Sequence, residues 1–406
     1  MKTDIFKKLG PGLLFAGAAI GVSHLVQSTR AGADFGWGLL WALLIVNLFK
    51  FPFFQFGPRF ALATKKSLLE GYFKMGKIYL WIYFILNIAT MFTIQTAVTI
   101  VTASLASKVF GITPNLVFWS LIVTFICFAI LLIGKYKLLD KTIKWIILIL
   151  TLSTFIALLI AFINNDSELS FDQILPKKNQ LIFLIAFMGW MPAPLDISIW
   201  HSLWAIEKNK NLKNSFNFKE GLFDFKIGYI TTVFLAICFM GLGSLVMFGT
   251  NLEFSNQGGV FADQLVKLYT ANLGEEVYIF IAIAALTTMF STSLTTLDAS
   301  PRAMQKTSQL LFPNLKFLNY FFWIIVLSCG TSSIFIFLLS EMGKLVEIAT
   351  VLSFITAPFY AILNYSLVIG GQMPEKFKPN KNLRILSVFG IIFLLSFTIG
   401  YLITII

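Results

Sequence analysis

The sequence is poor in charge and in the side chains that most enzyme sites use. Only 12% of its 406 residues are charged, and it has two histidines and three cysteines. The cysteines, Cys127, Cys238 and Cys329, stand in apolar segments at no spacing typical of a disulfide or zinc framework, so we interpret them as small buried hydrophobes. The sequence has no HExxH helix, phosphate-binding loop or nucleophile–base pairing. We therefore expect no enzyme and no cofactor.

Hydrophobic residues make up 57% of the chain, which is typical of membrane proteins rather than of soluble domains. The net charge of +12 would by itself suggest a nucleic-acid partner. The basic residues instead follow the membrane topology described next. We therefore expect a lipid bilayer as the surroundings and no nucleic-acid binding.

Apolar runs of about 20 residues, the length that crosses a bilayer, predict eleven spans. They lie near residues 9–31, 36–63, 79–107, 112–134, 143–164, 180–206, 226–249, 276–300, 318–340, 345–370 and 384–405. With the N-terminus inside, the inner segments carry 24 lysines and arginines, the outer segments carry six, and Lys50 lies within a span. Cytoplasmic loops carry such an excess. We expect a multi-pass protein of the inner or plasma membrane with a cytoplasmic N-terminus.

Two of the predicted spans are interrupted. The first contains Gly10-Pro11-Gly12 and, at its middle, Gly21-Val22-Ser23-His24; the sixth contains Pro192 and Pro194, followed by Asp196. Each proline removes a helix hydrogen bond, and such a break is tolerated only where protein or a water-filled cavity surrounds it.

Interrupted helices five spans apart are typical of an inverted-repeat transporter with a midplane site. We expect one all-α transmembrane domain over residues 1–406. Its first five-helix repeat covers 1–164, its second covers 165–371, and an extra helix covers 384–405.

Three stretches resemble the Nramp family (natural resistance-associated macrophage proteins) of proton-coupled divalent metal transporters. The first span reads GPGLLFAGAAIGVSHLVQSTRAGA and is similar to that family's first span. Met191-Pro192 resembles its sixth-span Met-Pro-His, and Leu352-Ser353-Phe354 with Pro358-Phe359 resembles its tenth span. The resemblance implies a LeuT-type fold of five plus five helices and secondary transport of a divalent metal as substrate.

The departures from the family pattern fall at the metal site. Gly21-Val22-Ser23-His24 stands where the family has its metal-binding Asp-Pro-Gly-Asn, so the anionic ligand of the first span is missing. Met191 matches the thioether ligand, and Met188 falls where the family uses a backbone carbonyl. The resemblance therefore implies an altered metal selectivity.

The family's coupling residues are also replaced. Gln95 and Val98 fall where the family carries acidic residues of its proton path, and Thr356 falls near its tenth-span glutamine. The eighth span carries a hydroxyl-rich run that includes Ser291 and Thr292, and LeuT-type transporters often bind sodium through such hydroxyls. Sodium is therefore a rival to the proton as coupling ion, although such a run also joins helices by hydrogen bonds.

Met191, His24 and Asp196, with Ser23 and the Met188 carbonyl, can together rebuild a cation site, because thioether, imidazole and carboxylate are all metal ligands. Asp196 has two other readings, a path-lining carboxylate and a helix cap. His24 is alternatively a packing residue. Two other functions stay open: transport of an organic or amino-acid-like solute, and a sensor that does not transport.

Overall fold

The computed structural model describes residues 10–164, 170–177, 180–211, 217–249, 264, 278–338 and 342–405. All the regular secondary structure in this part of the chain is helical. Its elements are α2 (Pro11–Ala19), η1 (Ser23–Ser28), α3 (Thr29–Phe35), α4 (Leu40–Thr64), α5 (Leu68–Met75), α6 (Lys77–Phe110), α7 (Leu116–Ile163), α8 (Leu181–Trp190), α9 (Ile197–Asn211), α10 (Phe218–Val246), α12 (Tyr278–Leu311), α13 (Tyr320–Phe337), α14 (Met342–Ile369), η5 (Glu375–Phe377) and α15 (Lys381–Ile405).

Among these residues, eight helical stretches are long and apolar enough to cross a membrane. Two of them, Leu116–Ile133 and Trp145–Ile163, lie within α7 and match the predicted fourth and fifth spans. The predicted first span is the bent pair Pro11–Ala19 and Ser23–Phe35, which meet at 49°. The predicted sixth span is divided into the short apolar helix α8 and the following helix α9. Both predicted breaks are therefore present.

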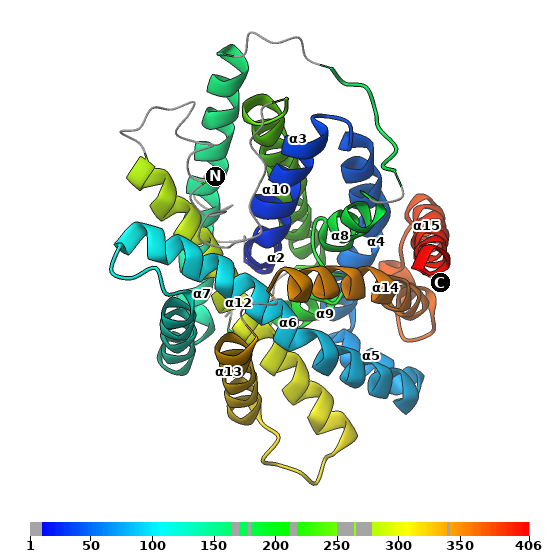
Figure 1. Ribbon diagram of the computed structural model, residues 1–406. Helices are drawn as coiled ribbons and strands as arrows, with labels where there is room; N and C mark the ends of the chain where they lie inside the picture. Colours follow the sequence, from blue (N-terminus) through cyan, green and yellow to red (C-terminus); the bar gives the residue numbers. More distant parts are fainter. Residues whose placement is uncertain are drawn as a thin grey trace, which may run out of the picture.

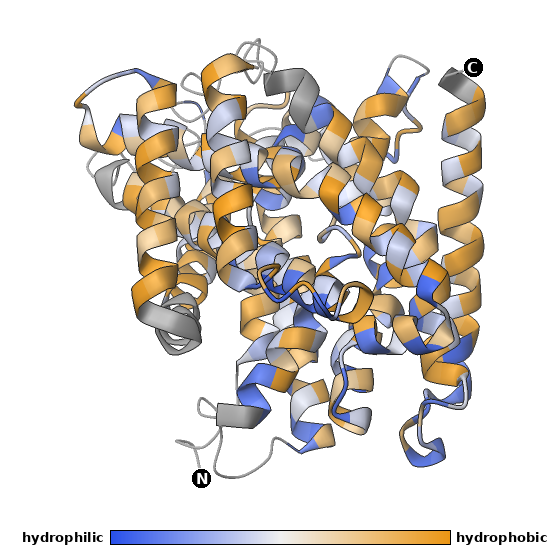
Figure 2. Ribbon diagram, turned by 90° about the horizontal axis from the view of Figure 1, so that it is seen from below, coloured by the Kyte–Doolittle hydropathy of each residue, from blue (hydrophilic) through white to orange (hydrophobic). Residues whose placement is uncertain are grey.

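Apolar side chains cover the outside of the bundle, as a lipid-facing surface requires. Phe125 and Ile133 on α7 are 70% and 83% exposed, and Ile403 on α15 is 70% exposed. The helix that leads to the C-terminus is hydrophobic along most of its length in Figure 2. Helix α15 lies at the edge of the bundle and packs against α4 and α14 (Figure 1).

The first half of the interrupted first span is tightly bound to α10. A Cβ atom on Gly12 would lie 2.1 Å from the carbonyl oxygen of Asp224, and one on Gly228 would lie 2.0 Å from that of Gly12. Glycine at both positions lets the two backbones touch. The Asp224 carboxylate accepts hydrogen bonds from the amides of Gly10 (2.9 Å) and Gly12 (2.7 Å). It thereby satisfies two of the amides that the start of a helix leaves free.

Candidate functional site in the interrupted helices

The break in the sixth span is an extended, buried segment between α8 and α9. Helix α8 ends at Trp190, Met191 has φ −91° and ψ 124°, and α9 begins at Ile197. Met188 and Met191 are fully buried, and Asp196 is 5% exposed. The last carbonyl groups of a helix have no partner within it, so those of α8 need another donor or a cation.

Lys50 of α4 supplies that cation. Its Nζ donates hydrogen bonds to the carbonyl oxygens of Met188 (2.8 Å), Gly189 (2.7 Å) and Met191 (3.1 Å). An ammonium group has three hydrogens, and here each has one acceptor. The side chain is fully buried, and it sits at the C-terminal end of α8, where the helix dipole is negative. Two carbonyl oxygens from the last turn of α8 and one from the start of the break therefore converge on one positive charge.

Lys50 is not among the site residues predicted from the sequence, where it is only a lysine inside the second span. The available signal was its position, because an ionisable residue within a transmembrane helix marks a functional site by default. Its partners are backbone carbonyls about 140 residues away in the chain, at separations of 138 to 141. No residue pattern records such a contact.

Asp196 brings the opposite charge to the same region. Its Oδ1 atom is buried and has no hydrogen-bond partner among the residues that the structure describes. It lies near enough to Lys50 for an ionised carboxylate to attract the ammonium group. Asp196 also lines a cavity of about 10 Å³ together with Thr356 and Tyr360 of α14, so the structure brings a predicted metal ligand and a predicted path residue together. Such a volume has room for about one water-sized species.

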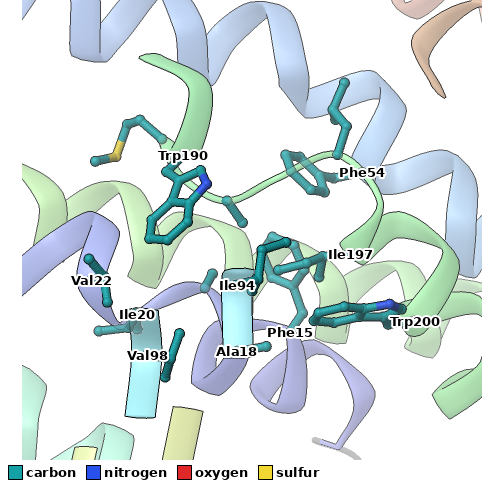
Figure 3. Packing of buried hydrophobic residues seen from close by; sticks show 14 of the residues in the cluster. Phe15, Ala18, Ile20, Val22, Phe54, Ile94, Val98, Trp190, Ile197 and Trp200 are labelled. Carbon is teal, nitrogen blue, oxygen red and sulfur yellow. The ribbon is translucent and has the colours of Figure 1, made fainter. Parts of the chain in front are cut away.

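A second cavity, of about 30 Å³, lies at the break in the first span. Ser23 and Thr292, both predicted, are in its wall, together with Trp190 and Trp200. Ile94 and Pro194 border both cavities, which are therefore neighbours. Figure 3 shows Trp190, Ile94 and Val98 gathered with Val22 and Ile20 from the first break. Most of this wall is apolar.

His24 is held in place by two hydrogen bonds. Its Nδ1 lies 2.7 Å from Ser23 Oγ, and its Nε2 lies 2.9 Å from the carbonyl oxygen of Thr232 on α10. Both ring nitrogens are thus used within the protein, and a metal would have to displace one of these partners. The geometry favours the packing alternative for His24. The role of His24 and Ser23 as metal ligands stays a prediction.

Thr292 of α12 contacts the first break through its hydroxyl group. Its Oγ1 lies 3.0 Å from the carbonyl oxygens of both Gly17 and Ile20, and 3.2 Å from that of Thr288. One hydroxyl hydrogen serves only one of these oxygens well. Gly21 faces the same side chain, since a Cβ there would lie 2.7 Å from Thr292 Cγ2. The neighbouring Ser291 Oγ is buried without a partner in the described part of the chain.

Gln95 joins α6 to α12. Its Nε2 donates to Thr99 Oγ1 (3.1 Å) and to the carbonyl oxygen of Ser293 (3.3 Å), and its Oε1 accepts from Thr296 Oγ1 at 2.6 Å. These bonds give Gln95 a structural role, and its predicted part in coupling stays a prediction. Across the described ranges, no three His, Cys, Asp or Glu residues are grouped so as to hold a metal ion.

Residues 12–404 match the sequence model of the family described as natural resistance-associated macrophage protein-like. The chain belongs to the Nramp family. It is 36% identical over 406 residues to an uncharacterized protein of Pasteurella multocida, a match that covers 98% of this chain and 92% of that one.

The chain is also similar to proteins at lower sequence identity. The Nramp chain is 24% identical to the divalent metal cation transporter MntH of Staphylococcus haemolyticus, with 97% of this chain and 91% of that one covered. In structure it is similar to a manganese transporter of Eremococcus coleocola, with a TM-score of 0.69 and 13% identity over 97% of this chain and 85% of that one. It is also similar to MhsT in complex with L-phenylalanine (TM-score 0.65, 13% identity, 96% and 98% covered).

These likenesses confirm the predicted fold class, an all-α membrane protein of the LeuT type with its first and sixth spans broken. Membership of a transporter family also confirms that the chain is not an enzyme. The division into repeats at residues 164 and 371 stays a prediction.

Proposed function

We propose that this Nramp protein is a secondary transporter of divalent cations and that its ion site is the break between α8 and α9. The convergence of the Met188, Gly189 and Met191 carbonyl oxygens on one buried positive charge carries this proposal. In transporters of this architecture, unwound carbonyls and half-helix ends coordinate ions. The named relatives, which include a divalent metal cation transporter and a manganese transporter, support the same class of substrate.

Asp196 is the carboxylate that this site offers to the ion. Its Oδ1 is buried and unpartnered in the described part of the protein, and a buried divalent ion needs anionic compensation. Carboxylate and carbonyl oxygens suit hard cations such as Mg²⁺ and Mn²⁺. The first span supplies no carboxylate, because Gly21 stands in the ligand position of the family. We therefore propose a selectivity shifted toward oxygen-binding ions, with the Met191 thioether as the only soft ligand.

We also propose that sodium is the coupling ion. The oxygen atoms of Gly17, Ile20, Thr288 and Thr292 lie together at the first break. Sodium is bound by carbonyl and hydroxyl oxygens of broken helices in transporters with this arrangement. Gln95, in contrast, is neutral and hydrogen-bonded, which does not favour a proton relay through α6.

Uptake of Mn²⁺ into proteoliposomes tests both proposals. Asp196→Asn should reduce the uptake rate at least about tenfold, because even groups that only support a metal ligand contribute 10- to 100-fold. Glu375→Gln is the matched control, since Glu375 is an exposed carboxylate in η5 paired with Lys378. Replacing Na⁺ by N-methylglucamine should slow uptake as well. An Asp196→Asn protein that transports Mn²⁺ at the wild-type rate would contradict the proposed site.

One observation favours an organic solute as the transported substrate in place of a divalent cation. The larger cavity has mostly apolar walls that include Trp190 and Trp200, which suit an apolar side chain better than an ion. Inhibition of Mn²⁺ uptake by L-phenylalanine, measured in the same proteoliposomes, would support this alternative. Uptake that is insensitive to amino acids would leave the divalent cation as substrate.

A further inference from the structure

We propose that Lys50 is a tethered cation that occupies the oxygen atoms a transported ion would otherwise use, so that Lys50 determines how tightly the site binds divalent ions. This inference rests on the proposed function, because it takes the break between α8 and α9 as the ion site. It assigns a specificity role to a residue outside the helices that form the break.

The contacts of Lys50 are those of a bound cation. The three acceptors, the carbonyl oxygens of Met188, Gly189 and Met191, lie 2.7 to 3.1 Å from Nζ. The bonds to Met188 and Gly189, 2.8 and 2.7 Å long, have the lengths of charge-assisted hydrogen bonds. Rings of backbone carbonyls replace the hydration shell of an ion in the same way. The ammonium group therefore takes the place of an ion, and the carbonyl oxygens take the place of its first layer of water.

A divalent ion and the Lys50 ammonium group exclude one another at these oxygens. An ion bound to them needs metal–oxygen distances of roughly 2.0–2.6 Å. That position overlaps the space that Nζ fills, and two positive charges in a buried, weakly screened region repel strongly. The ion can bind only when the ammonium group withdraws from the carbonyl oxygens.

Helix α4 fixes the position from which Lys50 reaches the break. Tyr229 of α10 donates a hydrogen bond of 2.6 Å to the carbonyl oxygen of Asn47, one turn before Lys50. Farther along α4, Gly57 packs on α9 so closely that a Cβ there would lie 2.2 Å from the carbonyl oxygen of Ser198. Lys50 thus comes from a helix anchored on two neighbours. A movement of α8 away from α4 would separate the ammonium group from all three oxygens at once.

Asp196 gives the two cations a shared counter-charge. Asp196 lies near enough to Lys50 for an ionised carboxylate to attract the ammonium group, and its Oδ1 has no hydrogen-bond partner among the described residues. With Lys50 in place, the region is close to neutral and has no need of a further cation. Removal of the lysine charge leaves the carboxylate uncompensated, and a divalent ion would then restore the balance.

Binding of Mn²⁺ and Mg²⁺ to the full-length protein in detergent, measured by isothermal titration calorimetry, tests this proposal. Lys50→Met removes the charge and keeps an apolar stem, and it should bind at least about tenfold more tightly than wild type. Lys50→Arg keeps a cation and should show no such gain. The double variant Lys50→Met/Asp196→Asn should lose the gain, because it removes the counter-charge as well.

The possible outcomes distinguish the role of Lys50 from the proposed ion site. Tighter binding in Lys50→Met alone supports the tethered cation, whether or not wild type binds measurably. Equal affinities in wild type and Lys50→Met would overturn the role of Lys50 and leave the proposed ion site intact. Absence of binding in all variants, with folding shown by thermal unfolding, would overturn both. If Lys50→Met does not fold, Lys50→Gln retains hydrogen-bond donors for the carbonyl oxygens without a charge, and the same comparison applies.

Discussion

Lys50 and Asp196 bring groups of opposite charge into the same buried region, and the proposed ion site depends on both. Asp196 could be predicted from sequence because it follows two prolines in an apolar segment. The contacts of Lys50 could not, since they join side chain to backbone across the fold. His24 was predicted as a ligand from its place in the first break. Its partner Thr232 stands 208 residues away, so the sequence did not reveal that both ring nitrogens are engaged.

The close packing of Gly21 against Thr292 can be tested by substitution. Gly21→Ala should lower the free energy of unfolding by about 1–3 kcal/mol, the usual cost of overpacking. The new Cβ would lie 2.7 Å from Thr292 Cγ2, and the Thr292 hydroxyl is bonded to the backbone. Thr292→Ser removes that methyl group and keeps the hydroxyl, so it should recover part of the loss in a double-mutant cycle of thermal unfolding. Additive losses in the cycle would contradict this contact.

At the scale of elements, the interrupted helices are the features that the sequence predicted most directly. Proline at residues 192 and 194 and glycine at residue 21 mark the two breaks, and the structure confirms them between α8 and α9 and between α2 and η1. The π-helical turn of η1 was not predicted, because no residue type specifies it. On α12, Asp298 and Arg302 stand four residues apart, the spacing that brings helical side chains together, and they form an ion pair at 2.6 Å.

The anchoring of α2 on α10 can be tested as a property of these elements. Asp224→Asn should weaken the bonds to the amides of Gly10 and Gly12, because a neutral amide accepts less strongly than a carboxylate and has only one oxygen. We expect faster hydrogen–deuterium exchange over residues 10–19, measured by mass spectrometry. Glu375→Gln serves as control. Unchanged exchange in the Asp224 variant would show that backbone packing alone holds α2.

At the scale of the whole molecule, the length of the apolar segments and the uneven distribution of lysine and arginine were sufficient to predict a multi-pass membrane protein. Membership of the Nramp family over residues 12–404 and the likeness to LeuT-type structures confirm that reading. The sequence did not predict how the site residues are arranged. Predicted residues divide between two neighbouring cavities, Asp196 and Thr356 on one, Ser23 and Thr292 on the other. Only the packed helices determine which residues face which cavity.

The most direct test of the ion site is the anomalous scattering of manganese in crystals of Lys50→Gln grown with Mn²⁺. We expect a peak in the break between α8 and α9, at metal–oxygen distance from the Met191 carbonyl and the Asp196 carboxylate. That distance is roughly 2.0–2.6 Å for ions with oxygen ligands. A peak elsewhere in the bundle, or none at saturating Mn²⁺, would contradict the assignment of this break as the cation site.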